Sequence, residues 1–146
     1  HAMVGQTARS CDNSPGVFSV ATRLVQVDGA TAVLKPWEVA AAPDLDLPRE
    51  FRADAVVAVF NADRRQSLNE TLTRYRELPP APIRFLVGNV HRHRALDDTC
   101  EFLEDVDRAA ASLGMDACLL SAHAPSAQTK VFVDCLARRL IHGSPN

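Results

Sequence analysis

The sequence reads ADAVVAVFN over Ala53–Asn61 and IRFLV over Ile83–Val87. Both stretches are almost continuously apolar, which is typical of strands that are covered on both faces of a parallel sheet. A third, shorter apolar strand is predicted over Ala117–Ser121. These stretches decide the fold class, because buried parallel strands are connected by helices that pack on the sheet.

Three amphipathic stretches alternate with these strands, as a parallel sheet requires. The first helix is predicted to begin at Ser67, with Glu70 completing a capping box. The second is predicted over Thr99–Gly114 and the third over Ser126–Gly143, each capped by its first residue. The positions predicted to be buried are Leu68, Leu72 and Tyr75 on the first helix, Phe102, Leu103, Val106, Ala109, Ala110 and Leu113 on the second, and Val131, Phe132, Cys135, Leu136 and Leu140 on the third.

An antiparallel hairpin is predicted ahead of this alternation. Val17–Val27 alternates like a strand, and Asp28-Gly29 favours a two-residue turn. Ala32–Val39 returns as a second strand that Pro36 interrupts, since proline cannot donate to a ladder. We therefore predict an α/β fold of Rossmann-type, three-layer architecture: a mostly parallel sheet with flanking helices and an antiparallel hairpin at its edge.

A single domain is predicted over residues 17–143, because a chain of 146 residues has the usual length of one domain. Residues 1–16 are polar and aperiodic, and His1–Met3 resembles the remnant of a cleaved tag. Residues 144–146 are expected to form a short tail.

The composition excludes several classes of protein. The chain has 16 basic and 18 acidic residues, a net charge of -2, so no basic field attracts nucleic acid or an anionic membrane. The cysteines lack the paired spacing of zinc sites; we interpret them as buried thiols, with a disulfide as the open alternative. The only lysines, Lys35 and Lys130, do not precede serine or threonine, which excludes a phosphate-binding loop of the pattern GxxxxGK[ST].

Five stretches in this order resemble the small GTPase superfamily, and its Rab branch most closely. Gly16–Gly29 resembles the strand after the first switch, and Lys35–Ala40 stands where that family has Trp-Asp-Thr-Ala-Gly. Phe51–Val57 resembles its Tyr-Arg-Gly-Ala segment, Phe85–Asn89 the start of its guanine-reading loop, and Leu120–His123 its Ser-Ala-Lys loop. The resemblance covers nearly the whole chain and implies a truncated small-GTPase-like fold.

The departures from this family determine the functional expectation. The family's first strand, phosphate loop and following helix have no counterpart here. Glu38 replaces the metal-linked Asp, and Ala40–Pro43 lacks the water-orienting Gln. Only Asn89 remains of the Asn-Lys-x-Asp motif, and His123 replaces the Lys of Ser-Ala-Lys. Because phosphoryl transfer needs these parts together, the resemblance implies a pseudo-GTPase with no GTPase activity, catalytic residues, metal or cofactor.

The vestigial guanine-site positions are Asn89, Ser121, Ala122 and His123. The simpler interpretation is that Asn89 and Ser121 merely cap loops at the ends of strands, and we favour it over residual nucleotide binding. The nearby segment His91–Arg94 is interpreted as a solvated loop rather than a metal or anion site.

Three aromatic residues, Phe18, Trp37 and Phe51, are the candidates for contacts with a partner protein. In Rab proteins, aromatic residues near the first two positions form a partner-binding surface. The alternative is that Trp37 merely packs under the loops that correspond to the family's switches. Without the family's first strand, a stable sheet needs direct pairing of the neighbouring strands, cover from Val4–Pro15, or a partner chain. Of these we expect a protein partner or a second copy of the chain to cover the sheet.

The leading hypothesis is a Rab-like pseudo-GTPase that acts as a protein-binding scaffold in vesicle traffic or a multi-subunit complex. Such a protein would be cytoplasmic and peripheral to membranes through its partners, with neither membrane insertion nor nucleic acid binding. Two alternatives stay open. One is a genuine GTPase whose phosphate loop lies outside this sequence, and the other is an unrelated small α/β enzyme that uses the carboxyl ends of the strands.

Overall fold

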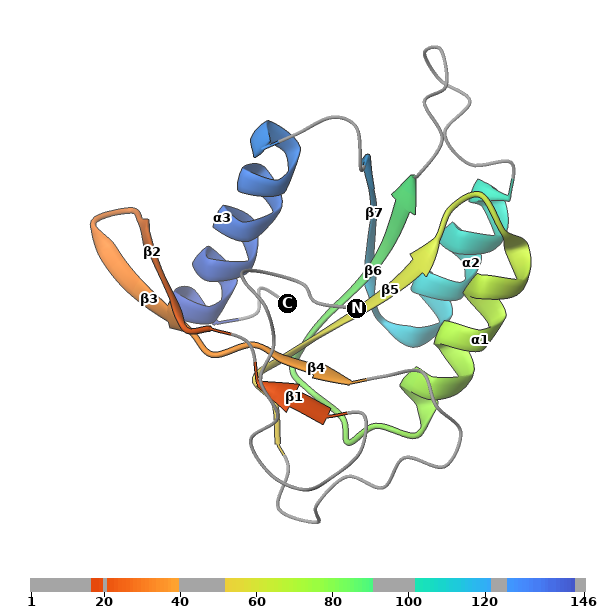
Figure 1. The fold of residues 1–146 in the computed structure, drawn as a ribbon, viewed down its shortest axis with the longest axis horizontal. Coiled ribbons are helices and arrows are strands. Elements are labelled where there is room, and N and C mark those ends of the chain that lie inside the picture. The colour runs from red at the N-terminus through yellow and green to blue at the C-terminus, as the bar shows by residue number, and fades with distance from the viewer. Residues whose placement is uncertain (1–16, 20, 40–51, 91–101, 122–125, 144–146) are drawn as a thin grey trace. The chain divides into compact units, whose positions relative to one another are not determined.

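The computed structural model describes residues 17–19, 21–39, 52–90, 102–121 and 126–143 (Figure 1). The chain divides into two compact units. One consists of Ala53–Lys130, and the other consists of His1–Arg52 together with Val131–Asn146. Each unit is described separately below.

The first of these units, Ala53–Lys130, is built on a parallel sheet. Its strands are β5 (Ala55–Asn61), β6 (Ile83–Val90) and β7 (Asp116–Ser121), in the order β5-β6-β7. The central strand β6 pairs in parallel with both neighbours. The three apolar stretches of the sequence therefore form the parallel sheet that they predict, and β6 continues to Val90, beyond its predicted end.

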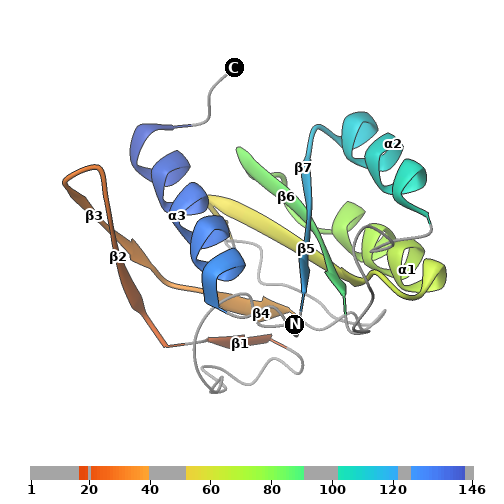
Figure 2. The ribbon, with the colours of Figure 1, turned by 90° about the horizontal axis from the view of Figure 1, so that it is seen from above.

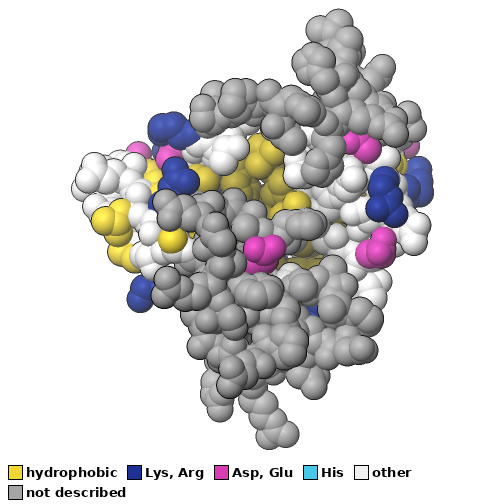
Figure 3. Space-filling model, in the orientation of Figure 1, with side chains coloured by type: hydrophobic (Ala, Val, Ile, Leu, Met, Phe, Trp, Pro, Cys, Tyr) yellow, Lys and Arg dark blue, Asp and Glu magenta, His cyan; other side chains and the backbone are white. Residues whose placement is uncertain are grey.

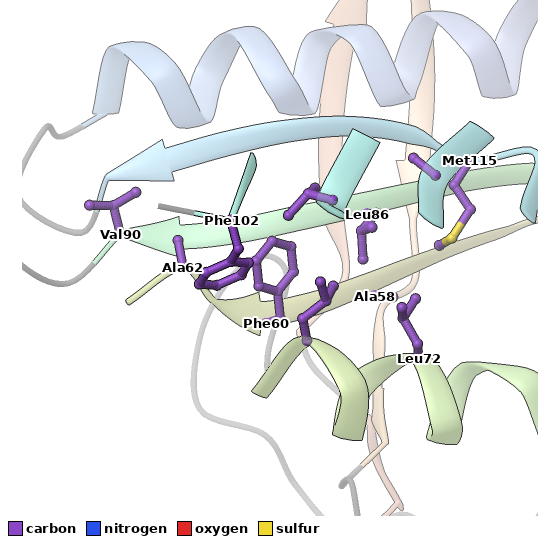
Figure 4. Close-up of a cluster of buried hydrophobic side chains, with 11 residues drawn as sticks. Ala58, Phe60, Ala62, Leu72, Leu86, Val90, Phe102 and Met115 are labelled. Carbon is purple, nitrogen blue, oxygen red and sulfur yellow. The ribbon is translucent and has the colours of Figure 1, made fainter. Parts of the chain in front are cut away.

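Two helices cover one face of this sheet. They are α1 (Arg65–Arg76) and α2 (Leu103–Leu113). Figure 4 shows that Phe60 of β5 and Phe102 lie side by side at the centre of the core, with their ring centroids 6.1 Å apart. The buried cluster between the sheet and these helices consists of Ala58, Phe60, Ala62, Leu68, Leu72, Leu86, Val90, Phe102, Val106, Ala110 and Met115.

Both ends of α2 have identifiable determinants. Gly114 adopts a left-handed φ of 66°, so α2 ends at the predicted glycine. The guanidinium of Arg84 donates a hydrogen bond to the carbonyl oxygen of Leu113, which places a cation at the negative end of the helix dipole. At its start, Phe102 is the N-cap residue without a side-chain cap, and the predicted cap Thr99 lies outside the described residues.

The predicted capping box of the first helix is wrong. Helix α1 begins at Arg65, two residues before Ser67, and its N-cap residue Arg64 makes no side-chain cap. The hydroxyl of Ser67 instead accepts a hydrogen bond of 2.9 Å from the backbone N–H of Asn61. The connection from β5 to α1 is so short that the Ser67 hydroxyl reaches the end of the strand rather than the helix terminus, which leaves Glu70 exposed and without a capping role.

Two predicted core positions are also wrong. Leu103 and Val131 are 43% and 70% exposed. In each case the neighbouring aromatic residue, Phe102 or Phe132, is buried instead. On α3 the buried positions Phe132, Val133, Leu136 and Ala137 form one side of the helix, and Val131 lies outside that side because successive helix positions point about 100° apart.

The second unit contains two antiparallel pairs of strands. β1 (Val17–Ser19) pairs with β4 (Trp37–Val39), and β2 (Arg23–Val27) pairs with β3 (Ala30–Leu34). Within the described residues, these pairs form separate two-stranded sheets and do not extend the edge of the parallel sheet. The antiparallel hairpin is therefore present as predicted, and its strands β2 and β3 form a two-stranded sheet of their own.

The turn of the β2–β3 hairpin is the one that the sequence predicts. Asp28 and Gly29 have φ angles of 53° and 78°. Positive φ at both central residues is the requirement of a type I′ turn, for which Asp-Gly is a preferred pair. Helix α3 (Ser126–His142), which belongs to this unit from Val131 onward, lies alongside the hairpin (Figure 2). None of the helices in the described part of the chain is long and apolar enough to cross a membrane.

Candidate functional site

Two regions are candidates for function, and the first is the carboxyl edge of the parallel sheet. Asn61 of β5 is the register partner of Asn89 on β6, and Val90 is the partner of Ser121 on β7. The structure therefore brings Asn89 and Ser121, two of the predicted vestigial positions, to the same edge as Asn61. Open α/β sheets bind ligands at this edge.

Hydrogen bonds within the chain occupy much of the polar backbone at this edge. The side-chain oxygen of Asn61 accepts a hydrogen bond of 2.9 Å from the backbone N–H of Asp63. The backbone N–H of Asn61 donates a hydrogen bond to the hydroxyl of Ser67. The carbonyl oxygen of Asn89 accepts a bond of 3.0 Å from the N–H of Ala62. These bonds close the turn after β5, so they favour a structural role for Asn61 and for the backbone of Asn89.

Ser121 has a similar backbone role at the end of β7. Its N–H donates a hydrogen bond of 3.1 Å to the side-chain oxygen of Gln128 in the first turn of α3. The other two vestigial positions, Ala122 and His123, lie outside the described residues. Across the described ranges, no group of three or more His, Cys, Asp and Glu side chains could hold a metal ion.

A charged cluster connects the N-terminal ends of α1 and α2. The guanidinium of Arg65 pairs with the carboxylate of Asp105 and lies 5.4 Å from the centre of the Phe102 ring. Asp105 also pairs with Arg108 at 3.0 Å. Asp105 is shared by two arginines, and Arg65 also stacks on the buried ring of Phe102. The cluster is therefore best explained as a structural contact that holds α1 and α2 together.

The second candidate region is the outer face of the β2–β3 hairpin, which carries Leu24, Gln26, Thr31 and Val33. Leu24 and Val33 lie directly opposite each other in the register and are 67% and 53% exposed. Figure 3 shows hydrophobic side chains at the surface over this hairpin. The other face of the hairpin is buried through Val25, Val27, Ala32 and Leu34.

The two ends of the hairpin carry charges of opposite sign. Arg23 and Lys35 are both exposed at the open end of the hairpin; Lys35 follows the alternation of the outer face, whereas Arg23 pairs with Leu34 and follows the alternation of the buried face. Asp28 is at the turn, where its carboxylate accepts a hydrogen bond of 3.0 Å from Nε of Arg138 and lies 3.5 Å from Nε2 of His142. The Arg138 hydrogen bond is the main reason that the pKa of Asp28 lies below its usual value. Asp28 is therefore contacted by Arg138 and His142, whereas the side chains of Arg23 and Lys35 are exposed to solvent.

The stabilising contribution of Asp28 should depend on pH. Its folded-state pKa is lowered, so its charge stabilises the fold above the unfolded-state pKa of about 3.9 and loses this effect as the pH falls through the folded-state value. Asp28→Asn, which tolerates the positive φ, should be slightly less stable than wild type near neutral pH and should approach it in acid. Urea denaturation of both proteins between about pH 7 and pH 3 measures this. A difference that stays constant over that range would contradict the role of the charge.

The predicted aromatic candidates occupy different places. Trp37 lies in β4 and is 45% exposed, so a large part of its ring is accessible. Phe18 lies in β1, where it is the register partner of Glu38. Phe51 is outside the described residues. The structure thus places Phe18 and Trp37 on paired strands of one unit.

No known family model matches this chain, and no curated protein sequence matches it. The geometry of the two candidate regions therefore carries the functional argument. The sequence did not single out Leu24 and Val33, although their spacing on either side of Asp28-Gly29 indicates that they face each other across the turn.

Proposed function

We propose that this chain is a non-catalytic protein-interaction module with the fold of a degenerate, Rab-like small GTPase. The observation that carries the interaction part is the exposed pair Leu24 and Val33 on the outer face of the hairpin. Single exposed apolar side chains are ordinary on protein surfaces, and interaction sites are marked by larger contiguous apolar patches, of which this adjacent pair would form a part. Trp37, which is 45% exposed, adds an aromatic side chain of the kind that anchors interfaces.

The carboxyl edge of the sheet supports the non-catalytic part of the proposal. The backbone of Asn89 and Ser121 is engaged in hydrogen bonds that close the connections around them. The sequence offers no lysine for a phosphate loop, and the segment after Asn89 reads Val90-His91-Arg92 in place of the family's Lys-x-Asp. The proposal places the protein in a cytoplasmic scaffold or in vesicle traffic, peripheral to membranes through its partners.

Affinity capture with matched variants tests the interaction part. The variant Leu24→Thr/Val33→Thr removes the apolar pair and keeps side chains that favour strands. Leu103→Thr is the control, because Leu103 is also an exposed leucine but lies on α2. We expect wild type and the control to recover the same proteins, and the double variant to recover about tenfold less of them. This decrease corresponds to a loss of about 1.4 kcal/mol in binding free energy. Equal recovery by all three proteins would contradict a partner site on the hairpin.

A further inference from the structure

We infer that the hydroxyls of Ser67 and Thr71 on α1 close the carboxyl-terminal half of the β5 edge against pairing with another strand. This closure keeps a second copy of the chain from adding a strand to the sheet at that position. The inference goes beyond the proposed interaction function and is independent of it, because every contact that carries it lies within the unit Ala53–Lys130.

The edge in question is the side of β5 that faces away from β6. Among the strands that the structure describes, β5 stands at one end of the order β5-β6-β7. The backbone N–H of Ala62, directly after β5, donates a hydrogen bond of 3.0 Å to the carbonyl oxygen of Asn89 on β6. Backbone groups of successive residues in a strand point to opposite sides, so those of Val59 and Asn61 point away from β6. Such an outward row of N–H and C=O groups is a template for another strand unless something covers it.

Helix α1 and the turn before it occupy these outward groups. The carbonyl oxygen of Val59 accepts a hydrogen bond of 2.9 Å from the hydroxyl of Thr71. The backbone N–H of Asn61 donates a hydrogen bond of 2.9 Å to the hydroxyl of Ser67, and its carbonyl oxygen accepts one of 3.1 Å from the N–H of Arg64. An added strand would have to displace these bonds before it could pair with Val59 and Asn61.

The spacing of the two hydroxyls matches the spacing of the backbone groups that they contact. Ser67 and Thr71 are four residues apart, which is about 6 Å along a helix. Val59 and Asn61 are two residues apart, which is about 7 Å along a strand. The next helix position in this series, Tyr75, packs against the buried cluster instead, so we confine the closure to the carboxyl-terminal half of β5.

Amide hydrogen exchange of the wild-type chain tests the inference without a variant. The backbone N–H of Asn61 should exchange at least about a hundredfold more slowly than in an unfolded chain, because it is held by the half-buried Ser67. Ser67→Ala should then accelerate this exchange about tenfold. Exchange of the wild-type Asn61 amide at the unfolded rate, or an unchanged rate in Ser67→Ala, would overturn the inference.

Self-association of a variant tests the closure of the edge. Ser67→Ala/Thr71→Ala removes both hydroxyls and keeps a strong helix former at each position. Sedimentation velocity should show that this variant self-associates at least about tenfold more tightly than wild type, because its outward backbone groups can then pair with a second copy. If the double variant does not fold, Thr71→Ala takes its place, and Thr71→Ser, which keeps the hydroxyl, should behave as wild type.

Two controls separate edge pairing from other effects of substitution in α1. Thr73→Ala also removes a threonine hydroxyl, but this hydroxyl is exposed and donates to the carbonyl oxygen of Asn69 within the helix. Leu72→Val disturbs the buried face of α1 and leaves both edge hydroxyls in place. Neither control should self-associate more tightly than wild type. Equal self-association of wild type and the hydroxyl variant, or equally tight self-association of Leu72→Val and the hydroxyl variant, would overturn the inference.

Discussion

Leu86→Ala should lower the free energy of unfolding by about 3 kcal/mol, whereas Leu24→Ala should change it by less than about 0.5 kcal/mol. The two substitutions remove the same atoms. Leu86 is 0% exposed at the centre of β6, and Leu24 is 67% exposed on β2. Alanine at position 86 leaves a cavity among the residues that pack beneath α1 and α2, whereas alanine at position 24 only changes contact with water.

Urea denaturation of the two variants beside wild type measures this difference. Near-equal losses would show that Leu24 is packed in solution, and the outer face of the hairpin would then not be a free surface. A neutral Leu24→Ala has a functional consequence as well. If Leu24 contributes nothing to stability, its exposed side chain has no role in the fold and is available for contact with a partner.

The second large effect is expected at Gly88, where alanine should destabilise the chain by about 2 kcal/mol. A Cβ atom at this position would lie 2.5 Å from Cδ2 of Leu119 and 2.7 Å from Cζ of Phe60. Phe60 is fully buried and is the register partner of Gly88, so its ring has little room to move. Because Gly88 has no side chain, the ring of Phe60 can pack directly against the backbone of β6 at this position.

A double-mutant cycle identifies the cause of this loss. Leu119→Val removes the nearest clashing atom, so Gly88→Ala should cost about 1 kcal/mol less in the Leu119→Val background than in wild type. Additive losses would contradict the steric account. The result also bears on the resemblance to small GTPases, because Gly88 belongs to the Phe85–Asn89 stretch that resembles the guanine-reading loop. Packing alone is a sufficient reason for glycine at this position.

The features that the sequence predicted correctly have local or periodic causes. The turn at Asp28-Gly29 follows from the residues that must adopt positive φ. The three parallel strands follow from continuous apolar stretches, and the end of α2 follows from Gly114. In each case a few neighbouring residues determine the outcome.

The features that it missed depend on contacts between distant residues. The Ser67 hydroxyl binds the end of the preceding strand, which no capping rule considers. Alternation in the hairpin shows that it has two faces, but the face that is covered depends on α3, whose Arg138 meets Asp28 across 110 residues. The exposure of Leu24 and Val33 therefore could not be predicted from their own segment. The backbone roles of Asn89 and Ser121 similarly depend on Ala62 and Gln128.

The central claim is that this fold holds a protein-interaction module without a working nucleotide site. Titration of the wild-type chain with fluorescently labelled GTP and GDP, with and without Mg²⁺, tests it most directly. The account predicts no saturable binding up to about 1 mM nucleotide, equivalent to a binding free energy weaker than about -4 kcal/mol. Saturable micromolar binding that requires Mg²⁺ and falls with Asn89→Ala would contradict the account and establish a genuine nucleotide site at the carboxyl edge of the sheet.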